Sequence, residues 1–197
     1  MTEEIGVAKY TDRIKKLASY VSPGETVADI GPDHGYLGIW LVKNGISPRV
    51  IMTDIAEGPL AIARANAERY VAPLSCGKQS GAMDFRLGDG IAPLAPGEVG
   101  TVVIAGMGGE TIIGILEADM GKTRSFLKYI LQPRTKTELL RAWLNGSGGD
   151  QSEKPAGQER PPDKQPSLKI VAEDTVAERG RNCEIIVVTT ATSMDSG

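Results

Sequence analysis

Residues 26–36 read TVADIGPDHGY, a short apolar run that leads into a turn containing glycines and acids. A short apolar run that ends in glycine is typical of a buried strand. Residues 36–44 follow with apolar side chains at helical spacing, and Gly45 lies just beyond them, where a glycine commonly ends a helix. The stretch therefore predicts a strand, a tight turn at Gly31–Gly35 and a helix, which is the opening unit of a Rossmann-like sheet.

The same alternation continues along the chain. Further strands are expected at residues 49–55, 83–88, 100–105 and 128–132. Helices are expected at residues 3–21, 58–69, 109–117 and 135–144. Thr135 and Glu138 have the spacing of a capping box. Residues 168–176 and 183–190 flank a polar turn and predict an antiparallel hairpin. The pattern predicts an α/β fold: a doubly wound, mostly parallel sheet that ends in this hairpin.

Length and composition fit one domain over residues 1–197. The chain has 41% hydrophobic and 24% charged residues, which is ordinary for a globular protein. Residues 146–167, GSGGDQSEKPAGQERPPDKQPS, consist almost wholly of glycine, proline, polar and charged residues. Such a segment buries too little apolar surface to offset its ordering entropy, so we expect a flexible loop there.

Several functional classes are disfavoured by composition. The net charge of −3 argues weakly against a protein that coats nucleic acid, because such proteins are usually strongly basic. Cys76, Cys183 and the single histidine, His34, are too few for a disulfide framework or a His-rich metal site, so no metal is expected. No apolar segment suits a signal peptide or a membrane helix, and we therefore expect a soluble, cytoplasmic protein without a membrane partner.

Polar residues and glycines follow each predicted parallel strand. In strand order they are Gly31–Tyr36, then Asp54, then Gly88, Asp89 and Gly90, then Gly106–Gly109, and finally Gln132, Pro133 and Arg134. In open α/β sheets, ligands bind beyond the carboxyl ends of the strands. The sequence therefore predicts one site at that edge of the sheet.

The acids suggest the ligand. The turn after the first strand lacks the G-x-G-x-x-G pattern of nicotinamide enzymes, and the chain has no P-loop. Asp29 could bind an α-amino group, Asp54 the ribose hydroxyls and Asp89 an exocyclic adenine amine. Three acids around a nucleoside with a cationic head group fit S-adenosylmethionine.

Five stretches carry a family resemblance. They are VADIGPDHGYLGIWLV, IAEGPLAIARAN, FRLGDGIAPL, VIAGMGGETIIGIL and LQPRTKTELLRAWL. Through them, residues 10–145 resemble the bacterial tRNA adenine-N1 methyltransferases that modify position 22, the TrmK type. The resemblance implies a class I methyltransferase that binds S-adenosylmethionine and methylates N1 of an adenine in tRNA.

The resemblance also implies roles for site residues. Those expected to bind the cofactor are Asp29, Gly31, Asp33, His34, Gly35, Tyr36, Asp54, Asp89, Gly90, Gly106 and Met107. Those expected to meet the target adenosine or its phosphates are His34, Met107, Gln132 and Arg134. Asp54 stands where the family has glutamate, and Arg134 where it has asparagine. Adenine N1 already carries an in-plane lone pair, so His34 is open to either a general-base or a positioning role.

Two other functions remain open. The family carries a helical C-terminal domain implicated in tRNA binding, and we expect this chain, which ends at Gly197, to lack it. A methyltransferase of the same fold with a small-molecule or protein substrate is therefore one alternative. A non-catalytic cofactor-binding subunit is the other. In favour of RNA, residues 121–141 contain six basic residues and one acidic residue, which predicts a phosphate-binding footprint beside the fifth strand. The oligomeric state is left open.

Overall fold

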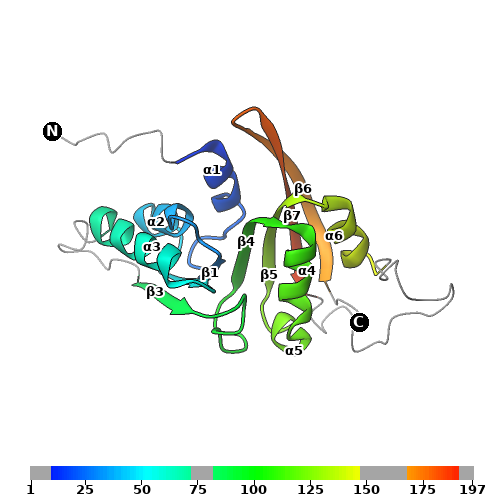
Figure 1. The fold of residues 1–197 in the computed structure, drawn as a ribbon, viewed down its shortest axis with the longest axis horizontal. Helices are drawn as coiled ribbons and strands as arrows, with labels where there is room; N and C mark the ends of the chain where they lie inside the picture. The colour runs from blue at the N-terminus through cyan, green and yellow to red at the C-terminus, as the bar shows by residue number, and fades with distance from the viewer. Residues whose placement is uncertain (1–9, 72–81, 147–167, 191–197) are drawn as a thin grey trace.

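A seven-stranded sheet with the order β3-β2-β1-β4-β5-β7-β6 runs through the computed structural model (Figure 1). The structure describes residues 10–71, 82–146 and 168–190. The strands are β1 Val27–Ile30, β2 Arg49–Asp54, β3 Ala82–Leu87, β4 Thr101–Gly108, β5 Lys128–Thr135, β6 Leu168–Glu178 and β7 Arg181–Thr190. The helices are α1 Asp12–Ala18, α2 Tyr36–Lys43, α3 Glu57–Tyr70, α4 Gly109–Glu117, α5 Met120–Thr123 and α6 Thr137–Leu144.

The first five strands run parallel to one another, and β7 pairs antiparallel with both β5 and β6. The predicted doubly wound sheet with a C-terminal hairpin is therefore confirmed. The chain leaves β1 for β2 on one side and later returns to pair β4 with the other side of β1. Such a reversal of strand order opens a crevice at the carboxyl ends of β1 and β4, where ligands bind in folds of this kind.

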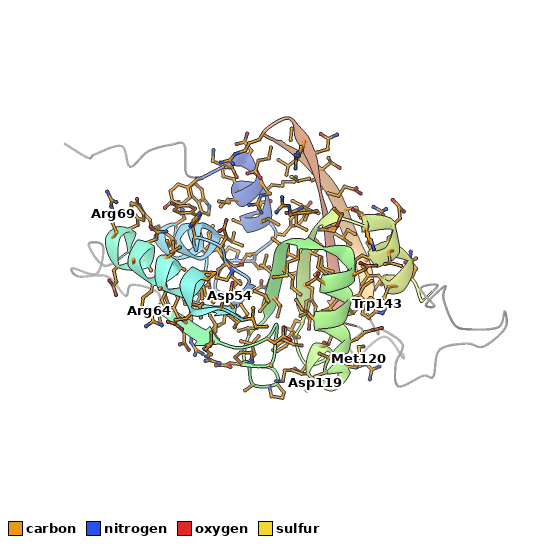
Figure 2. All side chains as sticks on the ribbon, viewed as in Figure 1. Asp54, Arg64, Arg69, Asp119, Met120 and Trp143 are labelled. Carbon is orange, nitrogen blue, oxygen red and sulfur yellow. The ribbon has the colours of Figure 1, made fainter. Side chains whose placement is uncertain are left out.

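Two apolar layers cover the sheet, because alternate side chains of each strand face opposite sides. Helices α1, α2 and α3 pack on one face, where Leu17, Ile39 and Met52 are fully buried. Helices α4 and α6 pack on the other, where Phe126 and Trp143 are buried and the Trp143 indole donates a hydrogen bond to Glu117 at 2.6 Å (Figures 1 and 2). Burial of both faces explains why the parallel strands read as nearly continuous apolar runs.

The predicted capping box is wrong. Thr135 is the last residue of β5 and pairs with Gly108 of β4, and the helix begins only after Lys136. Lys136 adopts a left-handed φ of 56° and gives α6 no side-chain cap. Strands β4 and β5 pair beyond their predicted ends, and Thr135 therefore belongs to β5 and not to the helix.

Two other predictions fall partly outside the described residues. The helix expected at residues 3–21 is α1, Asp12–Ala18, and residues 1–9 lie outside the described chain. A flexible loop is predicted at residues 146–167, and all of them except Gly146 also lie outside the described chain.

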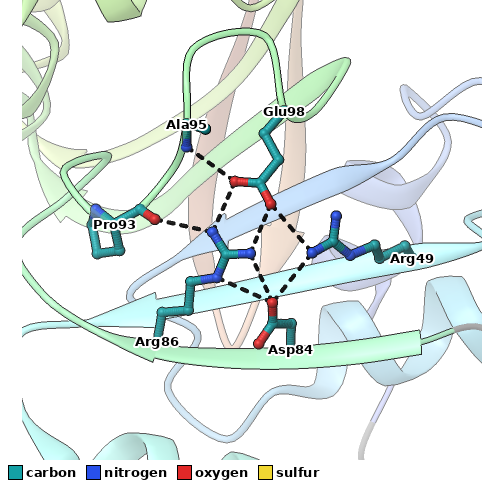
Figure 3. Close-up of polar contacts among 6 residues, drawn as sticks. All are labelled: Arg49, Asp84, Arg86, Pro93, Ala95 and Glu98. Atoms are coloured by element: carbon teal, nitrogen blue, oxygen red, sulfur yellow. Dashed lines mark hydrogen bonds and ion pairs between the residues drawn. The ribbon is translucent and has the colours of Figure 1, made fainter.

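A charged network ties the loop after β3 to the edge of the sheet (Figure 3). Arg86 forms ion pairs with Asp84 at 2.8 Å and Glu98 at 2.7 Å, and Arg49 contacts both acids. Arg86 also donates a hydrogen bond to the Pro93 carbonyl at 3.0 Å. The hydrogen bonds from Arg86 lower the pKa of Glu98 to about 2. The network thus fixes the connection that leads into central strand β4.

Candidate functional site

The turn between β1 and α2 is held in an uncommon backbone conformation. Gly31, Asp33 and Gly35 have φ values of 67°, 52° and 74°, in the left-handed region that favours glycine. A Cβ on Gly31 would lie 2.3 Å from the Cε of Met107 in β4, so the absence of a side chain lets the two strand ends approach. Asp33, a non-glycine residue in this region, is strained, and strain of this kind clusters at functional sites.

A cleft of about 880 Å³ opens at the carboxyl ends of β1, β2, β4 and β5. Ten of the sequence-predicted site residues line it: Asp29, Gly31, Asp33, His34, Tyr36, Asp54, Gly106, Met107, Gln132 and Arg134. These residues come from four separate strand ends, so the convergence that the strand-end pattern predicts is present.

Three predicted residues do not line the cleft. Gly35 lies against α3 and β2, and a Cβ there would be 3.0 Å from that of Ala63. The Gly90 carbonyl accepts a hydrogen bond from the buried Thr53 hydroxyl at 2.8 Å. Asp89 is exposed on the loop after β3. The structure gives Gly35 and Gly90 packing and backbone functions, and it leaves the adenine contact of Asp89 a prediction.

Asp29 is a buried acid at the base of the cleft, with only 4% of its surface exposed. Burial raises the pKa of Asp29 to about 7, and the positive charge of Arg13 opposes that rise. Among the described residues, no side chain donates a hydrogen bond to this carboxyl group. A buried acid that faces a cleft without a donor suits a cationic ligand group.

Gln132 holds the ends of β4 and β5 together. Its side-chain oxygen accepts hydrogen bonds from the Gly106 N–H at 3.1 Å and from Nη1 of Arg13 at 3.4 Å. Its amide nitrogen donates to the Pro133 carbonyl at 2.9 Å, and the residue is 2% exposed. Because both ends of the amide are engaged in the fold, the geometry supports a positioning role for Gln132 in preference to direct chemistry.

Asp54 and His34 each make a structural contact and also present a polar group on the cleft. One Asp54 oxygen accepts the Ala56 N–H at 2.9 Å at the start of α3, and the other has no donor among the described residues. The His34 carbonyl accepts a hydrogen bond from Asn66 at 2.9 Å. The His34 ring stays about half exposed, with its Nε2 3.6 Å from Oδ1 of Asp33 and its centroid 5.7 Å from that of Tyr36. Asp54 therefore keeps one carboxylate oxygen for a ligand, and the His34 ring remains accessible to one.

Sequence reasoning missed one wall of the cleft, which α1 and the β6–β7 turn supply. Its members are Arg13, Ile14, Leu17, Glu178, Arg179, Arg181, Asn182 and Cys183. The Nε of Arg13 donates to Glu178 at 2.7 Å. No sequence motif identifies the residues of this wall. The one available signal was the helical spacing of apolar residues in α1, which predicts that one face of this helix is buried.

The basic stretch at residues 121–141 does not form the single footprint predicted for it. Lys128 pairs with Glu25 at 2.9 Å, Lys136 pairs with Glu110, and Arg141 contacts three glutamates. Lys128 and Arg134 lie near opposite ends of β5, so the strand itself separates their charges. Of the six basic residues, Arg134 alone is among those that line the cleft.

Two structural findings concern metals and membranes. Within residues 10–71, 82–146 and 168–190, no group of three or more His, Cys, Asp or Glu side chains is arranged to hold a metal ion. No helix in these described ranges has the length and apolar character needed to cross a membrane.

Comparisons with known proteins identify the family of the chain. A family model described as a methyltransferase domain matches residues 10–150. The tRNA (adenine(22)-N(1))-methyltransferase of Bacillus subtilis (strain 168) is 35% identical over 136 residues, which cover 69% of this chain and 54% of that protein. The chain thus spans about half the length of the curated relatives that it matches.

Solved structures show the same likeness. Streptococcus pneumoniae Sp1610, in complex with S-adenosyl-L-methionine, is 32% identical with a TM-score of 0.72, over 91% of this chain and 72% of that one. The B. subtilis m1A22 tRNA methyltransferase TrmK is 29% identical with a TM-score of 0.72, over 91% and 66%. The chain therefore belongs to the methyltransferase domain family, and its predicted kinship with the TrmK type is confirmed.

Proposed function

We propose that this protein transfers the methyl group of S-adenosylmethionine to N1 of an adenine in tRNA, in the cytoplasm. One observation carries the proposal: a buried acid, Asp29, and a second acid, Asp54, lie at the ends of neighbouring parallel strands and line one cleft with the Gly106–Met107 turn. Position 22 is proposed as the target because of the family resemblance and because the B. subtilis relative is a tRNA (adenine(22)-N(1))-methyltransferase.

The residues of the cleft fit the cofactor. Asp29 has no donor among the described side chains and would accept the α-amino group, while the nearby charge of Arg13 would suit the carboxylate. The free oxygen of Asp54 would accept the ribose hydroxyls. Ile55 and Leu87 are not among the residues that line the cleft, but Ile55 follows Asp54 and Leu87 ends β3, and their side chains, 73% and 59% exposed, would offer an apolar surface to the adenine ring.

The protein's task in the reaction is alignment. The bound cofactor supplies a methyl group on a positively charged sulfur, which makes that methyl electrophilic. Adenine N1 attacks with an existing lone pair, and the product is the 1-methyladenine cation, so no proton has to leave during transfer. His34, half exposed on the rim, then serves to position the base and not to deprotonate it. Correct orientation of the two reacting groups supplies most of the acceleration.

The target base must leave its stack to reach the cleft, which costs a few kcal/mol. Met107 and Arg134 lie at the ends of β4 and β5, beside the turn that Gln132 holds. We assign Met107 to contact with the extruded base and Arg134 to contact with its phosphate.

A methyl-transfer assay on unmodified bacterial tRNA tests the proposal. The full chain is incubated with S-adenosylmethionine and two transcripts, one with adenine at position 22 and one with guanine there, and the nucleosides are analysed by mass spectrometry. We expect 1-methyladenosine only from the first. Cofactor binding without any 1-methyladenosine would overturn the proposal and favour a small-molecule or protein substrate, or a non-catalytic subunit.

A further inference from the structure

The cleft carries opposite charges on its two sides. Asp29, Asp33 and Asp54 line it where β1 and β2 end. The arginines that line its other side, beside β5 and the hairpin, are Arg13, Arg134, Arg179 and Arg181. A cationic ligand is attracted to the first side and a polyanion to the second.

Three of these arginines differ from Arg13 in their contacts. Arg134, Arg179 and Arg181 are exposed, and in the described part of the chain none of them forms an ion pair or a side-chain hydrogen bond. Arg13, by contrast, is bonded to Glu178, which directly precedes Arg179 in the chain and also interacts with the charge of Arg179. We call Arg134, Arg179 and Arg181 the arginine edge.

The turn that presents two of them has an unusual composition. Arg179 and Gly180 connect β6 to β7, with φ values of 50° and 74°. A two-residue hairpin with positive φ at both positions favours asparagine, aspartate or glycine at the first. An arginine there costs about 1 kcal/mol of backbone strain. A strained residue on the rim of a ligand cleft, whose guanidinium makes no hydrogen bond or ion pair among the described residues, is a sign of a binding function.

We propose that the arginine edge binds the phosphates that flank the target nucleotide, so that the β6–β7 turn is an RNA-binding element. The inference rests on the proposed function. Arg134 lies near the end of β5, Arg181 begins β7 and Arg179 lies in the turn before it, and β7 pairs with β5. Guanidinium groups presented by two strands suit successive phosphates of one backbone, and each can bind a phosphate through two hydrogen bonds.

The arginine edge also gives the RNA an orientation. The acids near β1 and β2 repel a polyanion, and the unpaired arginines attract it to the opposite side. An extruded base can then enter between the two sides, with its own phosphates held at the β5–β7 side and the cofactor at the β1–β2 side. Phosphate contacts of this kind fix the register of a nucleic acid without reading its sequence.

The experiment measures binding of unmodified tRNA to the full chain over a series of salt concentrations. The variant is the double substitution Arg179→Gln and Arg181→Gln, with Arg134→Gln made separately. The control is Arg64→Gln with Arg69→Gln, two exposed arginines of α3 that lie on the other side of the molecule (Figure 2). The two double variants remove the same charge. Calorimetry with S-adenosylmethionine reports whether each variant keeps its folded cleft.

We expect the hairpin double variant to bind tRNA about 10- to 100-fold more weakly at low salt, and its slope of log affinity against log salt to fall by about 1.5. Arg134→Gln should lower the slope by about half as much. Cofactor affinity should stay within about twofold, and the α3 variant should bind tRNA as the unmodified protein does.

Equal weakening by the hairpin and α3 variants, or full tRNA affinity of the hairpin variant, would overturn the inference and leave the proposed function intact. One further result would overturn both the inference and the proposed function. If the unmodified chain binds S-adenosylmethionine but no tRNA even at low salt, then tRNA is not its substrate and the arginine edge has another use.

Discussion

Arg13 and Glu178 are 165 positions apart in the sequence, yet the Arg13 Nε donates a 2.7 Å hydrogen bond to the Glu178 carboxylate. The pair joins α1 to the end of β6, and both residues line the cleft. Asp174 of β6 adds an ion pair with Lys16 and a 3.0 Å hydrogen bond from Tyr20. This seam holds α1 as a wall of the site.

A double-mutant cycle on Arg13→Gln and Glu178→Gln should give a coupling energy of about 1 kcal/mol, since both side chains are only partly exposed. Urea unfolding of the four proteins measures it. Asp12 and Lys15, an exposed pair on the same helix, are the control and should couple by less than about 0.3 kcal/mol. Equal coupling in the two cycles would show that the seam contributes no more than a surface pair.

Asp54→Ala should lower the affinity for S-adenosylmethionine by at least about tenfold, because a carboxylate that accepts two ribose hydroxyls is lost. Asp54→Asn keeps the acceptor for the Ala56 N–H and should bind with intermediate affinity. The control is Asp119→Ala, which removes the acid that caps α5, away from the cleft (Figure 2). Isothermal calorimetry measures all three, and unchanged affinity in Asp54→Ala would remove Asp54 from the site.

Gly31→Ala should cost more stability than Gly45→Ala. Both glycines have nearly equal φ values, 67° and 65°, so both substitutions carry about 1 kcal/mol of backbone strain. A Cβ at Gly45 meets no heavy atom within 4 Å, whereas one at Gly31 meets the Met107 Cε at 2.3 Å. The free energies of unfolding and the cofactor affinities of the two variants are measured. Gly45→Ala reports the backbone strain alone, and any additional loss in Gly31→Ala reports the displacement of Met107. Equal losses of stability would show that the Met107 side chain moves aside at no cost.

Asp29 should make the unliganded protein less stable as the pH rises. Its folded pKa of about 7 lies above the ordinary value of 3.8, so the folded state holds this proton more tightly than the unfolded chain. The resulting stabilisation is complete below about pH 4 and is lost as the pH rises through about 7. Asp29→Asn has no such titration. Its stability relative to the unmodified protein should therefore increase from about pH 5 to about pH 8 in urea unfolding, and a constant difference would contradict the assignment.

Glu98→Gln should lower the free energy of unfolding by about 2 kcal/mol at neutral pH, because Arg86 loses a charged partner. Arg86 holds the pKa of Glu98 at about 2, below the ordinary 4.5. The stabilisation is complete above about pH 4.5 and is lost as the pH falls through about 2, so the difference should shrink in acid. Glu68→Gln, at an exposed acid of α3, is the control and should change stability little.

Much of the site was visible in the sequence because parallel strands deliver their carboxyl ends to one edge. Asp29, Gly31 and Asp54 line the cleft for that reason. Asp89 also follows a strand but is exposed on its loop and is not among the residues that line the cleft, and the order of residues along the chain does not encode the path of such a loop.

Apolar runs, helical spacing and glycines at strand ends determined the alternating fold, because these signals are local and report which side chains are buried. Only the tertiary structure decided which residues from distant segments of the chain line the cleft. Strand β7 enters between β5 and β6, and that pairing carries Arg179, Arg181 and Glu178 to the cleft while α1 brings Arg13 to meet them. The pairing of β4 with β5 likewise drew Thr135 into a strand. The periodicity of apolar residues predicts which face of a helix or strand is buried. Which other element packs on that face depends on long-range contacts.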